Sequence, residues 1–147
     1  MAANIQDLIA DFGVLDDWED RYRYVIELGK TLPALTDAEH SDANKVRGCA
    51  SQVWLVAEAG SDNSKTLTFR GDSDALIVRG LIAIVLALYS GRPAREIAAL
   101  DSEPVLEQMG LRDHLTAQRS NGLSSMVSRI RSEAKAAIGE PQVTSGR

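Results

Sequence analysis

One apolar stretch constrains this fold more than any other feature of the sequence. Within residues 75–89 only Arg79 and Gly80 are not apolar. A helix of this length spans about 22 Å, which is shorter than the roughly 30 Å hydrocarbon layer of a membrane. The stretch is therefore predicted to be a buried central helix of a water-soluble domain. The GDSDA turn before it offers Asp72 or Ser73 as the N-cap, and because its own aspartates would repel phosphate, capping is favoured over an anion site.

Composition narrows the class of protein. The chain has 147 residues, 44% of them hydrophobic, which suits a single domain over residues 1–138, with residues 139–147 as a flexible tail. A net charge of −5 argues against binding nucleic acid or acidic lipid through bulk charge. The N-terminus has neither the basic region nor the apolar run of a signal peptide, so a cytoplasmic location is expected.

Hydrophobic periodicity predicts helices before and after a small sheet. Apolar residues recur at helical spacing in 5–12 and again from Trp18 through Tyr22 to Gly29, and shorter helices follow around 95–100 and 103–109. A long last helix carries an apolar stripe over 123–137, and residues 31–44 form a loop. Residues 52–59 and 65–70 flank the turn GSDNS as a hairpin, with 45–47 as a third strand. The fold class predicted is α+β, a three-stranded antiparallel sheet flanked by helices.

The residue with the clearest chemical potential is Cys49, in the segment KVRGCASQVW between two predicted strands. A lone cysteine commonly serves as a small buried hydrophobe. Here Gly48 permits a tight turn and Arg47, with Lys45, can favour the thiolate, so a reactive thiol is an equal alternative. An unperturbed thiol with a pKa near 8.5 is only about 3% ionised at pH 7, so nearby cations matter.

Other chemistries find little support in the sequence. The only candidate bases for a cysteine hydrolase, His40 and His114, lie in no hydrolase motif. One cysteine and two histidines cannot close a tetrahedral zinc site or hold an iron–sulfur cluster, so no metal site is expected. Arg119, in QRSNG, opens the last helix with Ser120 and Asn121 as caps. An arginine there opposes the helix dipole, which points to a function, although a solvated surface arginine is the ordinary alternative.

Four motifs together resemble one family. The strings RYRYVIELGKTLP, RGCASQVWL, GDSDALIVRGLIAIVLALYSG and LRDHLTAQRSNGLSSMVSRI are similar, in order and spacing over about residues 5–135, to the SufE family of sulfur-acceptor proteins in iron–sulfur cluster assembly. Two departures are Ala50, where a polar residue is common, and Asn121, where the family often has glutamine. The resemblance implies the fold of IscU-type scaffolds, with the acceptor cysteine at the tip of a loop.

The resemblance also implies a function and partners. Cys49 matches the family's acceptor cysteine, which takes persulfide sulfur from a pyridoxal-phosphate-dependent cysteine desulfurase of the SufS or CsdA type. The sulfur passes on to an iron–sulfur scaffold of the SufBCD type or another acceptor, so the chain is a carrier that stimulates the desulfurase, not an independent enzyme. The cofactor belongs to the partner, and none is expected here.

A surface for the partner follows from the same motifs. The Cys49 loop, the GDSDA turn and the QRSNG turn are expected to converge on one face, with Asp74 and Arg119 as polar contacts and Arg47 and Gly48 in support. Asp74 could instead serve only the helix N-terminus, and Arg119 could brace the loop within its own chain. The alternative function is a non-catalytic domain that regulates a desulfurase by docking, with Cys49 incidental.

Overall fold

The computed structural model describes residues 4–60 and 65–139, and it begins with two amphipathic helices. Helix α1 (Ile5–Val14) starts at Asn4, whose side chain accepts a hydrogen bond from the backbone N–H of Gln6. Helix α2 (Trp18–Gly29) is capped in the same way by Asp17, one of the two predicted caps. The predicted apolar stripe of α2 is partly wrong. Tyr22, which belongs to that stripe, is 41% exposed, whereas Leu28, which does not, is buried.

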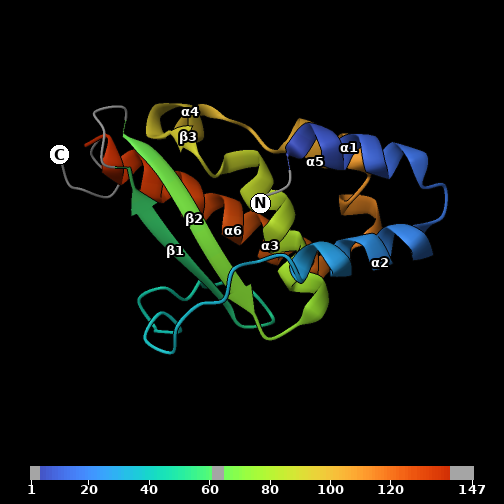
Figure 1. The fold of residues 1–147 in the computed structure, drawn as a ribbon, viewed down its shortest axis with the longest axis horizontal. Helices are drawn as coiled ribbons and strands as arrows, with labels where there is room; N and C mark the ends of the chain where they lie inside the picture. The colour runs from blue at the N-terminus through green and yellow to red at the C-terminus, as the bar shows by residue number, and fades with distance from the viewer. Residues whose placement is uncertain (1–3, 61–64, 140–147) are drawn as a thin grey trace.

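Helix α3 (Leu76–Tyr89) is the predicted buried helix and forms the centre of the core. It packs against α1, α2, β2 and the last helix, α6 (Ala117–Ala137), so that protein surrounds it on several sides (Figure 1). The predicted N-cap is wrong. Asp72 and Ser73 belong to strand β2 (Thr66–Ser73), which runs further than its apolar alternation suggested, and Ala75 occupies the cap position without a side-chain bond. Ser73 still contributes nearby, since its hydroxyl accepts from the backbone N–H of Ala75 at 3.2 Å.

The sheet is antiparallel with the order β1-β2-β3, where β1 is Val53–Ala59 and β3 is Arg92–Pro93. The α+β class with three strands is therefore as predicted, but the third strand is not residues 45–47. Lys45 forms only an isolated bridge to Trp54, on the free edge of β1. Strand β3 has two residues, too few to show any alternation in the sequence. Residues 61–64 of the predicted GSDNS turn lie outside the described part of the chain.

The second half is helical. Helices α4 (Ala94–Ala99) and α5 (Glu103–Met109) are followed by one turn of 3₁₀ helix, η1 (Arg112–His114), and then by α6. Helix α6 begins two residues before Arg119 because Thr116, and not Ser120 or Asn121, supplies the cap. Figure 1 shows α6 running behind the β1–β2 hairpin, which it contacts through β1. Residues 140–147 of the predicted tail are outside the described chain.

Helices α2 and α3 cross with their backbones in close contact. A Cβ placed on Gly80 would lie 2.0 Å from the carbonyl oxygen of Val25, and one on Gly29 would lie 2.7 Å from the backbone nitrogen of Gly80. Both positions therefore require glycine, and no side chain separates the two helices there. Among the described residues, no helix has the length and apolar character needed to span a membrane.

Candidate functional site

The Cys49 loop, residues 47–52, is closed at its base by strand-like hydrogen bonds. The backbone N–H of Val46 donates to the carbonyl of Val53 at 2.8 Å, and that of Leu55 donates to Asn44 at 2.9 Å. Within the loop Gly48 has φ 89°, a left-handed conformation that favours glycine. A Cβ at Gly48 would also lie 2.5 Å from the hydroxyl oxygen of Ser125, so the loop backbone rests directly on α6.

The Cys49 thiol is directed towards the first half of α6. The side chain is half-buried, and Sγ donates a weak hydrogen bond to the carbonyl of Gly122 at 3.6 Å. A Cβ on Gly122 would stand 3.5 Å from that sulfur, so the absence of a side chain at Gly122 keeps the space beside the thiol open. Burial raises the pKa of the Cys49 thiol. This shift is opposite in direction to the lowering of the thiol pKa expected from Lys45 and Arg47.

A pocket of about 230 Å³ adjoins the sulfur. Its floor is apolar and comes from α3 and α6, whereas its rim comes from the Cys49 loop and the start of α6. The lining residues are Cys49, Ala50, Ser51, Val78, Leu81, Thr116, Gln118, Arg119, Gly122 and Met126. The pocket can hold a group larger than a thiol hydrogen beside Cys49 while keeping that group against apolar side chains.

Arg119 lies on the rim of this pocket, in the first turn of α6. Its backbone N–H donates to the hydroxyl of Thr116 at 3.1 Å, which satisfies one of the free donors at the helix start. Its guanidinium donates to the phenolic oxygen of Tyr22 at 3.3 Å. Arg119 therefore links the start of α6 to Tyr22 on α2 and lines the same pocket as Cys49.

Asp74 braces the far end of the Cys49 loop. Its carboxylate accepts hydrogen bonds from the backbone N–H of Gln52 at 3.1 Å and from the Gln52 side chain at 3.5 Å. Asp74 is nevertheless exposed, as are Arg47 and Gly48 on the opposite side of the loop. The predicted segments thus meet around one loop, although QRSNG is helical here and not a turn, and Asp74 is not among the residues that line the pocket.

Two contributors to the site were missed in the sequence. The QRSNG motif, predicted as a turn, ends in Gly122, and a glycine inside a helical pattern costs about 1 kcal/mol and suggests a packing reason. Tyr22 belongs to the predicted apolar stripe of α2, whereas in the structure its hydroxyl accepts a hydrogen bond from Arg119. The contact between Tyr22 and Arg119 joins distant segments and leaves no local pattern in the sequence.

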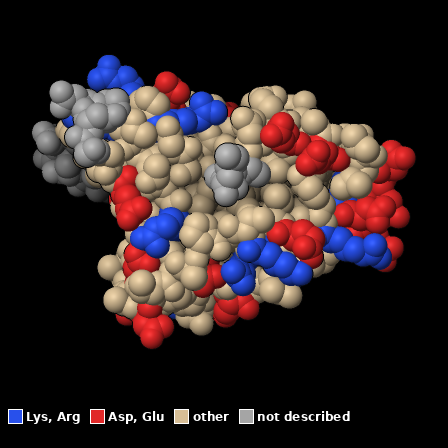
Figure 2. Space-filling view, viewed as in Figure 1, with Lys and Arg blue, Asp and Glu red and all other residues tan. Residues whose placement is uncertain are grey.

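The possible metal ligands and the charged side chains of the described residues define the surroundings of the site. Within residues 4–60 and 65–139, no group of three or more histidine, cysteine, aspartate or glutamate side chains is placed to hold a metal ion. Figure 2 shows basic and acidic side chains interspersed on the face in view, with carboxylates gathered at the end where α1 leads into α2. The exposed Asp16, Asp17, Glu19 and Asp20 lie in that connection and the first turn of α2. The site is thus a sheltered thiol beside a small pocket.

Comparisons with known proteins identify relatives over nearly the whole chain. Residues 6–134 match the family model described as SufE, the Fe-S metabolism associated domain. An uncharacterized SufE-like protein of Rhizobium etli is 60% identical over 134 residues, which are 90% of each chain. A second such protein, from Rhizobium meliloti, is 55% identical over 133 residues, 90% of this chain and 95% of the other. The solution structure of a hypothetical protein from Thermus thermophilus shares the fold, with a TM-score of 0.73 at 15% identity over 91% of this chain and 95% of that one.

Proposed function

The chain belongs to the SufE family of Fe-S metabolism domains, and on this premise we propose that it is a sulfur carrier whose acceptor atom is Sγ of Cys49. Membership of the family gives the chain a role in Fe-S metabolism. The observation that carries the finer proposal is the half-buried thiol beside a pocket with an apolar floor and room for another atom. A carrier needs such a space because a persulfide must be kept from water and stray thiols between two transfers.

The transfer is a displacement at sulfur. The Cys49 thiolate attacks the terminal sulfur of a persulfide on a cysteine desulfurase, whose pyridoxal phosphate belongs to that partner. The S–S bond of the desulfurase persulfide breaks as a new S–S bond forms on Cys49, and the desulfurase cysteine leaves as a thiolate that takes up a proton. The sulfane sulfur changes place without net oxidation or reduction. Delivery to a scaffold for cluster assembly repeats the step with Cys49 as the leaving group.

The resting conformation keeps the Cys49 thiol unreactive until a partner binds. Burial raises the pKa of Cys49, so the thiol is neutral and weakly nucleophilic while it lies against Gly122. A desulfurase that drew the loop outward would expose the sulfur, remove that burial and restore ionisation. Arg119 on the pocket rim and the exposed side chains of Tyr22 and Leu76 provide a surface for such docking.

The proposal is tested by intact mass after incubation of the protein with its cognate desulfurase and cysteine. The mass should rise by one or more sulfur atoms, and the added sulfur should be lost on reduction. Cys49→Ser should fold normally and gain no mass, because one atom changes at a loop tip and the nucleophile is removed. An unchanged mass for the unaltered protein, under conditions in which the desulfurase itself carries a persulfide, would contradict the carrier role.

The same variant separates the carrier from the docking regulator. A regulator acts by binding alone, so Cys49→Ser would then stimulate the desulfurase as well as the original protein does. For a carrier, the variant should bind the desulfurase with unchanged affinity and yet give no stimulation. Measuring affinity together with turnover thus distinguishes loss of the acceptor from loss of binding.

A further inference from the structure

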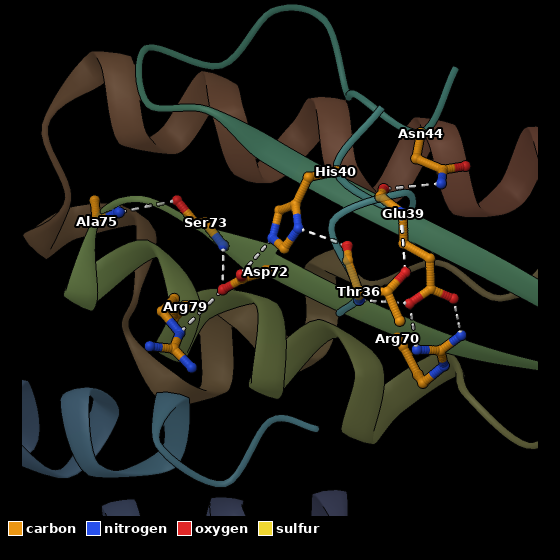
Figure 3. A network of polar contacts seen from close by, with 9 residues as sticks. All are labelled: Thr36, Glu39, His40, Asn44, Arg70, Asp72, Ser73, Ala75 and Arg79. Atoms are coloured by element: carbon orange, nitrogen blue, oxygen red, sulfur yellow. Dashed lines mark hydrogen bonds and ion pairs between the residues drawn. The ribbon is translucent and has the colours of Figure 1, made fainter. Parts of the chain in front are cut away.

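His40 has hydrogen-bond acceptors at both of its ring nitrogens. Nδ1 lies 2.8 Å from the backbone carbonyl oxygen of Thr36, and Nε2 lies 2.8 Å from a carboxylate oxygen of Asp72 (Figure 3). A neutral imidazole has one donor and one acceptor, so it can satisfy only one of these contacts. The imidazolium ion donates at both positions. The geometry around His40 therefore fits its protonated form.

The charges that face this ring come from three elements. Asp72 on β2 pairs with His40 through one carboxylate oxygen and with Arg79 of α3 through the other, at 3.2 Å. Asp37, in the same loop as His40, adds a second carboxylate nearby. On β1 the neighbour is uncharged, because the ring of Trp54 meets the imidazole edge-on at 4.7 Å.

A second ion pair flanks this group. Glu39, the residue before His40, forms a two-pronged pair with Arg70 on β2, with one contact of 3.0 Å. Figure 3 shows the two pairs side by side, each joining the loop of residues 31–44 to β2. Only the His40 pair contains a group that titrates near neutral pH.

These contacts hold the anchor segment, which we define as residues 36–46, and this segment leads directly into the Cys49 loop. Its far end pairs with β1, whose residue Trp54 is the partner both of Lys45 and of Asp72. Helix α6 holds the same segment through Arg129, whose guanidinium donates to the carbonyls of Ala43 at 2.7 Å and Lys45 at 3.1 Å. The anchor segment is therefore fixed by two permanently charged side chains, Arg70 and Arg129, and by one charge that depends on protonation, that of His40.

We propose that His40 is a positioning residue for Cys49: as an imidazolium it ties the anchor segment to Asp72 and keeps the Cys49 loop seated, and its deprotonation loosens that seat. Access to the thiol then depends on pH through His40 as well as through the thiol itself. The consequence for sulfur acceptance rests on the function proposed above. The positioning itself is a property of this chain alone and is measured without a desulfurase.

The direction of the effect follows from the neighbours of His40. The hydrogen bond to Asp72 is the main reason that the pKa of His40 is raised above its ordinary value, and the bond to Thr36 adds to it. A group whose pKa is raised in the folded state contributes its full stabilisation below its ordinary pKa, and the contribution is lost as pH rises through the raised value. The Cys49 loop is thus held in place at pH values below neutrality, where His40 is protonated, and is held less firmly at alkaline pH.

The test compares the alkylation rate of Cys49 by iodoacetamide in the unaltered protein and in His40→Gln, between about pH 5.5 and 8.5. Each comparison is made at a single pH, which removes the titration of the thiol itself. At the acid end the variant should react about two- to fivefold faster, the effect of losing a partly solvent-screened charged contact. The ratio should fall to about one at the alkaline end, where the unaltered protein has also lost the contact.

Two further variants distinguish positioning from a general loss of structure. Arg129→Gln removes one of the permanently charged contacts, so it should raise the alkylation rate by a similar factor at every pH. Asp72→Asn should move the NMR titration of the His40 ring to lower pH and reproduce the pH-dependent ratio. A ratio for His40→Gln that does not change with pH, or a His40 titration that Asp72→Asn leaves in place, would overturn the proposal. Neither readout needs sulfur transfer, so a failed carrier assay and a failed positioning assay remain distinct results.

Discussion

Replacement of Gly48 by alanine tests how the Cys49 loop is seated on α6. Two costs apply. An alanine at φ 89° adopts the left-handed region, which costs about 1–2 kcal/mol relative to glycine. Its Cβ would also lie 2.5 Å from the hydroxyl oxygen of Ser125, and turning that hydroxyl away costs a further 0.5–1.5 kcal/mol or so.

Gly91 provides a matched control for the first cost. It has φ 88°, and nothing lies within 4 Å of a Cβ placed on it. Gly91→Ala should therefore show the backbone cost alone, a fall in melting temperature of about 3–6 °C, at roughly 3 °C per kcal/mol for a chain of this size. Gly48→Ala combines both costs and should lose about 5–10 °C.

A double-mutant cycle isolates the contact with α6. Ser125→Ala removes the hydroxyl and leaves only a Cβ, at 3.4 Å from the added methyl group. Gly48→Ala should therefore be less destabilising in the Ser125→Ala background, by about 0.5–1.5 kcal/mol. The assay is thermal unfolding followed by circular dichroism, with Cys49 alkylation on the same samples. Equal losses for Gly48→Ala in both backgrounds would refute the reasoning, because the loop would then not rest on Ser125.

The remaining predictions concern charged groups. Arg119→Ala should weaken stimulation of the desulfurase at least about tenfold, since truncating one partner of a desolvated charge pair costs about 2–5 kcal/mol. Tyr22→Phe removes only the internal hydrogen bond of Arg119, so an equal loss in that variant would assign Arg119 to bracing its own chain. Glu39 has a pKa lowered to about 2, chiefly by Arg70, so its contribution to stability is present above its ordinary pKa and is lost as pH falls through about 2. Glu39→Gln should therefore be less stable than the unaltered protein at about pH 6, and urea unfolding should show the difference shrinking in acid.

The sequence predicts the elements whose signal is local and fails where contacts are distant. The buried helix, the two N-terminal helices and the hairpin carry clear periodicity, and their bounds are close to those predicted. Helix α6 starts earlier than predicted, because Thr116 supplies the cap that the sequence assigns to Ser120 or Asn121. The short strand β3 and the contact between Asp74 and Gln52 have no local pattern at all. Cys49 was identified through its motif, but its burial depends on Gly122, which is 73 residues away.

The direct crossing of α2 and α3 at Gly29 and Gly80 has a mechanical consequence. Since backbone meets backbone there, the two helices have no layer of side chains through which one could slide over the other. Helix α3 supplies Val78 and Leu81 to the pocket floor, and α2 carries Tyr22 beside the rim. The part of the floor that α3 supplies and Tyr22 beside the rim therefore belong to one stiff unit, against which the Cys49 loop can move. Under the proposed carrier function, a thiol that returned from a partner would meet the same α3 floor, so each round of transfer would begin against the same apolar surface.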